Sequence, residues 1–555
     1  MSFGGSAPAG KSGWSARGRE ARTLAIFRTM SETTATGSAE SLSPILSREA
    51  AFSTAALLGG LTALKLLIQL AGISRYGFFR DELYYLACGE HLAWGYVDQP
   101  PLIALVAWLA RHLFGNSIVA ARLFPVLAGA AVVGITGLFA RELGGGRLAQ
   151  FLAAAAILFA PACLAFSSFL SMNALEPFFW LLCAWLVLRV VKGSSPKLWL
   201  VFGVVAGVAL ENKHTMLVFG FALVVGLLLS GEHRLFRSKW IWIGALVALA
   251  LFLPNLLWEG RHGWPQIEVV RNAQRLKNMP VSPLRFLVEQ ILFLHPLAMP
   301  LWVGGIAWYF LDREVRRFRF LAWAYLIVLA IFISLGGKTY YALPAYPFLV
   351  AAGGVAFEAF VESPNRRWLR IAYPVLLVLG GVATIPFGVP VLSVDTFLRY
   401  SQAMPDSFRV RTERDAPILL PQLYADMFGW DSMAATVAGV YRQLPNSERA
   451  NCAILAGNYG EAGAIDYYGP ALNMPKAISG HNSYFYWGNR GYSGSCVILF
   501  GERATEYKSF FADVEQVTTI TSPHAMVGEQ NLPVYICRRP RAPLSVLWPN
   551  FKMII

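Results

Sequence analysis

A short polar stretch directly after the first hydrophobic segment carries the residues best suited to chemistry. Residues 80–85 read Arg-Asp-Glu-Leu-Tyr-Tyr, and residues 96–101 read Tyr-Val-Asp-Gln-Pro-Pro. Adjacent acids are ordinary on a soluble surface, but ionisable groups beside or within a bilayer are costly and are therefore candidates for function. Asp81 and Glu82 are consequently the first candidates for a site. Asp81 is also compatible with a helix cap and with an ion pair to Arg80 at the membrane interface.

Other polar residues are expected on the same face of the membrane, and they include both acids and bases. They are Arg75, Arg80, Asp81, Glu82, Asp98, Gln99, Asn173, Glu176, Arg261, His262, Glu268, Arg271, Arg275, Lys338, Tyr340, Tyr341 and Tyr346. Carboxylates and basic groups that converge on one face could hold a phosphorylated lipid head group and activate a nucleophile. The sequence shows no Ser-His-Asp set and no His or Cys residues at zinc-ligand spacing, so a hydrolase is not supported.

Several of these residues also have a purely structural interpretation. Glu176 could satisfy a buried helix end, and Lys338 could simply extend to the membrane interface. Asp98 precedes Gln-Pro-Pro and could serve only to shape a turn. The loop 259–285 could be an ordinary solvated loop, and the cluster 211–214 (Glu-Asn-Lys-His) could be a short connector.

The composition indicates the kind of protein that positions these residues. Of the 555 residues, 56% are hydrophobic and 14% are charged, whereas soluble proteins carry about 25% charged residues. A helix needs about 20 apolar residues to cross a bilayer, and many such runs are present. The chain is therefore predicted to be a mainly α, polytopic transmembrane helical bundle surrounded by membrane lipids. Its net charge of +14 is explained by basic cytoplasmic loops, so no nucleic-acid partner is expected.

Eleven membrane-spanning segments are predicted. They cover about 51–73, 118–140, 148–166, 170–191, 198–211, 214–230, 239–258, 286–311, 319–335, 341–361 and 368–388. The first two are separated by a polar and aromatic loop, 74–117, whose amphipathic piece 102–113 is expected to lie on the membrane surface.

Clusters of Lys and Arg occupy every second loop of this arrangement, and such clusters mark the cytoplasmic side. They fall in the N-terminal tail and around 141–147, 189–197, 234–239, 313–319 and 366–370. The alternate loops are thereby placed on the outer side, together with everything after 388. These outer loops are 74–117, 167–171, 211–214, 259–285 and 336–340.

Three regions follow: a disordered cytoplasmic tail (1–48), a transmembrane module (49–388) and an extracytoplasmic α/β domain (389–555). In the last region, strands are predicted at 451–456, 496–500 and 533–537, and helices at 422–443, 459–468 and 503–513. No GxGxxG or GxxxxGK motif supports a nucleotide site. One pair among Cys452, Cys496 and Cys537 could form a disulfide if the domain is extracytoplasmic.

Three motifs, in order along the chain, resemble the outer loops of bacterial lipid-linked sugar transferases. The first comprises 79–85 and 96–102, the second is 171–180 (Ser-Met-Asn-Ala-Leu-Glu-Pro-Phe-Phe-Trp), and the third is 337–347 (Gly-Lys-Thr-Tyr-Tyr-Ala-Leu-Pro-Ala-Tyr-Pro). Those enzymes have the GT-C fold and form glycosyltransferase family 39 and its relatives. The group includes the dolichyl-phosphate-mannose-protein mannosyltransferases and the aminoarabinose transferases of lipid A. Residues 458–465 and 479–484 resemble the C-terminal domain of many bacterial members.

The resemblance implies an inverting glycosyltransferase of the cell envelope. A hexose or pentose on a polyprenyl phosphate would move to lipid A, another glycan or a protein at the outer face of the bacterial inner (plasma) membrane. The C-terminal domain would be periplasmic. By analogy, Asp81 would act as general base on the acceptor hydroxyl, and Glu82 would orient Asp81 or a neighbouring base.

The donor phosphate implies further roles. A lipid phosphate leaves without a general acid but needs positive charge to stabilise the developing negative charge. Lys338, helped by Arg80 or by a residue of loop 259–285, would bind this phosphate, and Tyr340 and Tyr341 would hydrogen-bond the phosphate or stack on the sugar. The residues assigned to the substrate loops are Tyr84, Asp98, Gln99, Asn173 and His262.

One position departs from the relatives. Where many of them carry an acid in the second outer loop, this chain has Asn173, and Glu176 one turn later is expected to substitute as a catalytic acid. No cofactor is required, although a divalent cation, Mg²⁺ or Mn²⁺, could bridge Asp81 or Glu176 to the phosphate. A transporter or flippase of lipid-linked sugars is the alternative, but transporters place polar residues mid-span in repeated halves.

Overall fold

The computed structural model of the protein describes residues 36–404, 419–501 and 507–555, with side chains described from Thr54 onward. Contacts divide the chain into two units, 1–57 and 58–555. Helix α2 (Thr36–Gly72) begins in the first unit and ends in the second. Residues 1–35 of the predicted tail lie outside the described residues. Residues 36–48 belong to α2, because a helix nucleated in an apolar span extends at little cost, so the predicted boundary at 48 falls within a helix.

Seven helices of the described chain are long and apolar enough to cross a membrane, which makes this a multi-pass membrane protein. They are Thr54–Gly72 of α2, α5 (Ile118–Glu142), α8 (Met172–Val191), α11 (Lys239–Arg261), Arg316–Ser334 with α15 (Arg319–Ser334), Thr339–Phe360 with η5 (Thr339–Ala345) and α16 (Tyr346–Phe360), and Pro364–Gly388 with α17 (Leu369–Gly388). An eighth span is added if α13 (Pro283–Leu294) and α14 (Met299–Leu311) count as one bent pair.

The predicted count of eleven spans is not confirmed. The additional predicted segments fall on shorter apolar helices, namely α6 (Arg147–Leu158), α9 (Leu198–Asn212) and α10 (Thr215–Leu229). These have 12, 15 and 15 residues, fewer than the about 20 that a straight crossing requires. The bend of 96° between α13 and α14 lies at His295-Pro296, because a residue before proline is driven out of the helical region.

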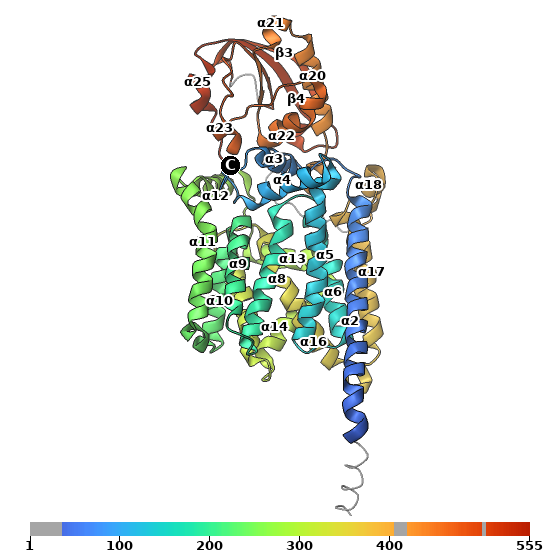
Figure 1. Ribbon diagram of the computed structural model, residues 1–555. Helices are drawn as coiled ribbons and strands as arrows, with labels where there is room; N and C mark the ends of the chain where they lie inside the picture. Colours follow the sequence, from blue (N-terminus) through green and yellow to red (C-terminus); the bar gives the residue numbers. More distant parts are fainter. Residues whose placement is uncertain (1–35, 405–418, 502–506) are drawn as a thin grey trace, which may run out of the picture. The chain divides into compact units, whose positions relative to one another are not determined.

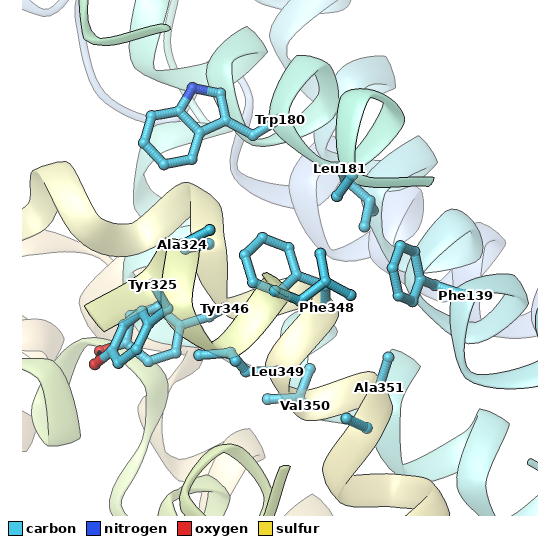
Figure 2. Close-up of a cluster of buried hydrophobic side chains, with 14 of the residues drawn as sticks. Phe139, Trp180, Leu181, Ala324, Tyr325, Tyr346, Phe348, Leu349, Val350 and Ala351 are labelled. Carbon is cyan, nitrogen blue, oxygen red and sulfur yellow. Dashed lines mark hydrogen bonds between the residues drawn. The ribbon is translucent and has the colours of Figure 1, made fainter. Parts of the chain in front are cut away.

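The bundle has a core of large side chains that interlock with small ones. Figure 2 shows Phe139 of α5, Trp180 of α8, Tyr325 of α15 and Phe348 of α16 converging, and all four are buried. At Gly353 a Cβ atom would collide with the backbone carbonyl of Leu301, so α14 and α16 cross with their backbones in contact. Small residues at such crossings provide the close packing that holds helices together in lipid, where no hydrophobic driving force acts between them.

The C-terminal region contains the small α/β domain that the sequence predicts. Its four strands are β1 (Cys452–Ala456), β2 (Cys496–Phe500), β3 (Phe511–Thr521) and β4 (Asn531–Pro540), in the order β1-β2-β4-β3. Strands β1 and β2 are parallel and are joined through α22 (Tyr459–Tyr468), whereas β4 is antiparallel to both of its neighbours. Residues 503–506 of the helix predicted at 503–513 lie outside the described residues, and the prediction is wrong from residue 511 onward, since β3 starts there. The misleading signal was the polar surface of β3, which is exposed at most of its positions.

A disulfide joins Cys452 and Cys496, which face each other across β1 and β2 in register. The predicted pairing within the C-terminal cysteines is therefore present, and Cys537 is free and buried. Disulfides persist in oxidising compartments, so this bond agrees with an extracytoplasmic domain.

Two short helices of the first loop, α3 (Arg80–Glu90) and α4 (Leu102–Phe114), connect the sheet domain to the bundle (Figure 1). One hydrophobic cluster contains Leu83 and Tyr84 of α3, Ile103 of α4, and Ile454 and Ile465 of the sheet domain. This shared core explains why residues 58–555 form one unit even though α17 ends at Gly388, where the transmembrane module is predicted to end.

The remaining helices are short. They are α7 (Pro161–Phe166), α12 (Pro265–Asn272), η2 (Ala273–Lys277), α18 (Val394–Gln402), α19 (Gln422–Ala425), α20 (Trp430–Gln443), α21 (Asn446–Arg449), α23 (Ser483–Trp487) and α25 (Leu544–Leu547), with further single turns at η1 (His233–Arg237), η3 (Pro296–Ala298), η4 (Arg316–Phe318), η6 (Pro364–Arg366), η8 (Gly469–Leu472), η9 (Val527–Glu529) and η10 (Trp548–Phe551).

Candidate active site

Helix α3 presents its two adjacent acids to different surroundings. Successive residues of a helix point about 100° apart, so Asp81 and Glu82 cannot face the same way. Both acids lie in the first turn of α3, where the helix dipole favours negative charge. Glu82 also accepts the Phe79 N–H at 2.8 Å and so closes the start of the helix.

Glu82 is fully buried and forms an ion pair with Arg122 of α5, at 2.7 Å between Oε2 and Nη2. Its Oε1 accepts the Leu170 N–H at 2.8 Å. Arg122 in turn donates to the carbonyls of Ile73 and Gly77, each at 2.7 Å. These contacts hold α3 against α5 and the 167–171 turn. These contacts give Glu82 a structural role, and its predicted role in orienting Asp81 or a neighbouring base stays a prediction.

Asp81 faces a cavity of about 250 Å³. The polar residues that line the cavity are Arg80, Asp81, Asn173, Lys277, Lys338, Tyr340 and Gln422. The apolar wall comes mainly from α7, α13 and the C-terminal region, and it includes Ala162, Ala165, Phe166, Phe169, Leu292, Phe293, Phe387 and Leu423. One carboxylate, three cationic side chains and a hydrophobic surface thus share a single space. Of the predicted site residues, five line it.

The third motif reaches the cavity because α13 holds η5 in place. Glu289 accepts the Thr339 hydroxyl at 2.6 Å, and Gln290 donates to the Thr339 carbonyl at 2.9 Å. Lys338 and Tyr340 flank this fixed residue, and the Lys338 ammonium lies 6.0 Å from the centre of the Tyr340 ring. The ring of Tyr340 packs against Phe166 of the apolar wall.

The second motif forms a polar cluster beside the cavity rather than a second acid within it. Glu176 is buried, and its carboxylate is paired with Lys213 at 2.8 Å and also accepts the Thr215 hydroxyl. Lys213 donates to the side-chain carbonyl of Asn173 at 2.7 Å, and Asn173 lines the cavity. Glu176 does not line the cavity, and its predicted catalytic role stays a prediction.

Tyr341 belongs to the same polar cluster. Its ring lies under the Lys213 ammonium at 4.4 Å, and it is absent from the residues that line the cavity. The predicted contact of Tyr341 with the donor therefore stays a prediction.

Tyr84 and Asp98 of the first loop form a second hydrogen-bonded pair, which also contacts Ser483 of the sheet domain. The Tyr84 hydroxyl donates to Asp98 Oδ1 at 2.7 Å and lies 2.7 Å from the Ser483 hydroxyl. Burial raises the pKa of Asp98 from 3.8 to about 6; the Tyr84 hydrogen bond lowers it and the nearby negative charge of Asp81 raises it. Burial raises the pKa of Tyr84 well above its usual value.

The two remaining predicted residues lie elsewhere. Gln99 is buried, and its side-chain amide lies near Cys88. Its backbone carbonyl accepts the Tyr96 N–H, so Gln99 shapes the loop. His262 is exposed at the end of α11, bonds to the Trp258 carbonyl and stacks on the Trp258 ring at 4.0 Å. Neither residue lines the cavity.

Four residues of the site and its surroundings were not predicted from the sequence. Arg122 stands alone as a charge in a predicted span, which was a usable signal, and Lys213 belongs to the cluster interpreted as a connector. Lys277 is one of several basic residues in its loop, and nothing in the sequence distinguishes it. Tyr459 donates its hydroxyl to Asp81 at 2.8 Å from a region nearly 400 residues away, so only the fold brings these two side chains together.

No group of three or more His, Cys, Asp or Glu residues could hold a metal ion within the described parts of the chain. Among the described residues that line the cavity, Asp81 is the single carboxylate. A divalent cation would therefore need most of its oxygen ligands from the substrate and from water.

Comparisons with known proteins agree with this architecture. Residues 98–258 match the family model for dolichyl-phosphate-mannose-protein mannosyltransferase. No curated protein matches the sequence. Together with the fold, the match confirms the resemblance to GT-C glycosyltransferases that the three motifs predict.

Two solved structures share the fold over nearly their whole length. The apo structure of ArnT from Cupriavidus metallidurans matches with a TM-score of 0.57 at 16% identity, over 85% of this chain and 97% of that one. The structure of the same protein bound to undecaprenyl phosphate gives a TM-score of 0.56 at 16% identity, over 86% and 98%. The protein is thus a multi-pass membrane protein with an ArnT-like GT-C fold.

Proposed function

We propose that this protein is an inverting glycosyltransferase that moves a sugar from a polyprenyl phosphate to an acceptor at the outer face of the bacterial inner membrane. The observation that carries the proposal is the cavity, where Asp81 and three cationic side chains meet an apolar wall. The family match and the fold shared with a protein solved with undecaprenyl phosphate support the same chemistry.

The cavity suits the head of a lipid-linked sugar. Its volume of about 250 Å³ is below the roughly 300–1,000 Å³ of sites that enclose a whole drug-sized ligand. A phosphate and the start of its prenyl chain need cations and an apolar surface side by side. Lys277, Lys338 and Arg80 supply the first, and the α7 and α13 side chains supply the second.

Asp81 is the group best placed to act on the acceptor. As the single carboxylate among the described lining residues, it can accept the proton of an acceptor hydroxyl while that oxygen attacks the anomeric carbon. The bond to the lipid phosphate breaks on the opposite side, so the anomeric configuration inverts. The negative charge that develops on the phosphate is stabilised by the lysines, and such electrostatic stabilisation is often the largest contribution to catalysis.

The orientation rests on two independent features. The basic clusters of the sequence favour a cytoplasmic location for the loops opposite the site. The Cys452–Cys496 disulfide favours an oxidising compartment for the sheet domain. Both features support a periplasmic sheet domain and a cavity that opens toward the same side.

A transfer assay tests the proposal. Purified protein would be given a panel of radiolabelled polyprenyl-phosphate sugars and a membrane extract that contains lipid A, glycans and proteins. We expect label to move to an acceptor, and Asp81→Asn to lower the rate by about 10²–10⁴-fold, the usual contribution of a general base. Asp513→Asn is the matched control, because Asp513 pairs with Arg539 on the exposed surface of the sheet domain.

Label that remains on the polyprenyl lipid with every donor would contradict the proposal. In that case a flippase assay in liposomes, with the same labelled donors, would test the alternative of transport.

A further inference from the structure

We infer that the sheet domain completes the active site, and that Tyr459 is a positioning residue that fixes the carboxylate of Asp81. This inference rests on the proposed function, because it assigns a role to the partner of the proposed base. It concerns the stretches 458–465 and 479–484, to which the transfer chemistry itself gives no role.

The central contact is the hydrogen bond from the Tyr459 hydroxyl to Asp81 Oδ1, at 2.8 Å. Tyr459 is the first residue of α22, and its side chain is buried. Its N–H donates to the ring nitrogen of His481 at 3.2 Å, and its own ring packs 4.8 Å from that of Tyr84. Tyr459 is therefore held from several sides, as a residue that sets the geometry of another must be.

The helix that carries Tyr459 lies directly on α3. A Cβ atom at Gly463 would come within 2.8 Å of the Leu83 backbone, and one at Gly460 would overlap the side chain of Arg80. Glycine at both positions lets the two helices touch, which brings the Tyr459 hydroxyl within reach of Asp81. This contact accounts for the Tyr-Gly-Glu-Ala-Gly pattern of residues 459–463.

The second stretch, 479–484, contacts the surroundings of Asp98 in the first loop. Ser483 lies 2.7 Å from the Tyr84 hydroxyl, which donates to Asp98, and it accepts the Val97 N–H at 3.2 Å. Asp81 and Asp98 are thus each tied to the sheet domain through a tyrosine hydroxyl. The C-terminal region also supplies part of the cavity wall, through residues 421–423.

A hydrogen bond to one carboxylate oxygen fixes the plane of the carboxylate and leaves its other acceptor positions available. An ionised carboxylate has two oxygens and about four acceptor positions, so Asp81 keeps the capacity to accept a proton from an acceptor hydroxyl. Tyr459 does not line the cavity. Its hydroxyl is therefore expected to act on transfer through Asp81, which separates it from a residue that binds substrate. The Arg80 guanidinium lies over the Tyr459 ring, 5.9 Å from its centre, and this ring stays in place when only the hydroxyl is removed.

Tyr459→Phe in the full-length protein tests the inference, because it removes the hydroxyl and keeps the packed ring. With a polyprenyl-phosphate sugar that the wild type uses, we expect kcat to fall roughly 10- to 100-fold, the size expected of a hydrogen bond to a charged group. The KM for the donor should stay unchanged. Tyr467→Phe is the matched control on the same helix, since the Tyr467 hydroxyl bonds to the Asn116 carbonyl instead, and it should keep the wild-type kcat.

A double variant keeps the test independent of folding. If Tyr459 acts through Asp81, then Tyr459→Phe should cost little further activity in an Asp81→Glu background, because groups that act as one unit are not additive. A wild-type kcat for Tyr459→Phe, an equal loss in Tyr467→Phe, or additive losses in the double variant would each overturn the inference and leave the proposed function standing. A wild-type protein that transfers no sugar would overturn both.

Discussion

The two sides of α3 carry neighbouring acids, Asp81 and Glu82, in very different surroundings. On one side, Asp81 is only half-buried, faces a cavity with three cations and is reached by a tyrosine of the sheet domain. On the other side, Glu82 is completely buried, and its charge is compensated by Arg122 and by two backbone N–H groups. Two neighbouring acids of one helix therefore have different roles: Asp81 is the residue to which we assign chemistry, and Glu82 holds the architecture.

The difference follows from the surroundings that each side of α3 offers to a carboxylate. A buried carboxylate is tolerated only when it is paired and hydrogen-bonded, and Glu82 meets both conditions within the protein. The cavity side instead places Arg80, Lys277 and Lys338 near Asp81, the single carboxylate among its described lining residues, and Arg80 also pairs with Asp426 at 3.7 Å. Such a site attracts an anion, and a lipid phosphate is an anion with a hydrophobic tail.

The largest effect is expected from a substitution on the buried side of α3, at Glu82. Glu82→Gln leaves the Arg122 guanidinium buried without its counter-charge, and the loss of one partner from a buried pair typically costs about 3–5 kcal/mol. We expect a clear drop in the unfolding temperature of the purified protein, measured by thermal denaturation in detergent. Asp81→Asn should unfold close to the wild-type temperature, because its carboxylate is not part of an ion pair of this kind.

A double substitution sharpens this prediction. Glu82→Met together with Arg122→Met removes both charges and should recover part of the lost stability, since apolar replacement of a whole buried pair is often neutral. Equal stability of the Glu82→Gln protein and the wild type would show that the pair does not hold α3 to α5.

The next effect concerns the cavity side. Lys338→Met and Lys277→Met each remove one cation that lines the cavity proposed to hold the donor phosphate, and removing one group that stabilises transition-state charge typically costs about 10²–10³-fold. We expect losses in kcat/KM of this order in the transfer assay. Lys476→Met is the control, because Lys476 pairs with Glu90 at the surface of the protein.

An unchanged kcat/KM in both cavity variants would contradict the assignment of the phosphate to this cavity. A loss confined to Lys338→Met would sharpen it, by placing the phosphate near η5 and away from the 259–285 loop.

The sequence predicted the architecture well because membrane insertion leaves a strong signal. Each predicted span falls on a helix or a pair of helices, and β1, β2, β4 and α22 lie where their patterns place them. The span count could not be settled, since α6, α9 and α10 are too short for a hydropathy rule to decide. Strand β3 was missed because its polar residues carry no apolar alternation.

The site was predicted less completely, and the reason is geometric. The motifs identified Arg80, Asp81, Asn173, Lys338 and Tyr340, all of which line the cavity. Partners that arrive from distant segments left no local pattern, as with Arg122 for Glu82, Lys213 for Glu176 and Tyr459 for Asp81. A single sequence shows which residues are unusual for their surroundings, but the partner of each is decided by the fold.

A smaller effect tests the side of α3 that meets the sheet domain. The pKa of Asp98 is about 6 in the folded protein, above its ordinary value of 3.8. The folded state therefore binds the proton more tightly, and the stability that Asp98 contributes is lost as the pH rises through this interval. The side chain in Asp98→Asn resembles the protonated acid. At a pH well above 6 this substitution should raise the unfolding temperature of the protein, and near pH 4 it should have little effect.

The charged neighbours of Asp98 allow a check on the cause. Asp81 raises its pKa and Lys277 lowers it, both less than burial does. A stability difference between Asp98→Asn and the wild type that does not change with pH would contradict the proposed titration.

The smallest expected effect is that of removing divalent cations. Magnesium at phosphate-transfer sites is usually held by one or two carboxylates together with substrate phosphates, and the described cavity offers one carboxylate beside three cationic side chains. Those side chains would repel a metal ion and already supply the positive charge that the leaving phosphate needs. We therefore expect the transfer rate to survive treatment with EDTA. Activity that disappears with EDTA and returns with Mg²⁺ or Mn²⁺ would show that Asp81 holds a metal, and its place as general base on the cavity side of α3 would then have to be reassigned.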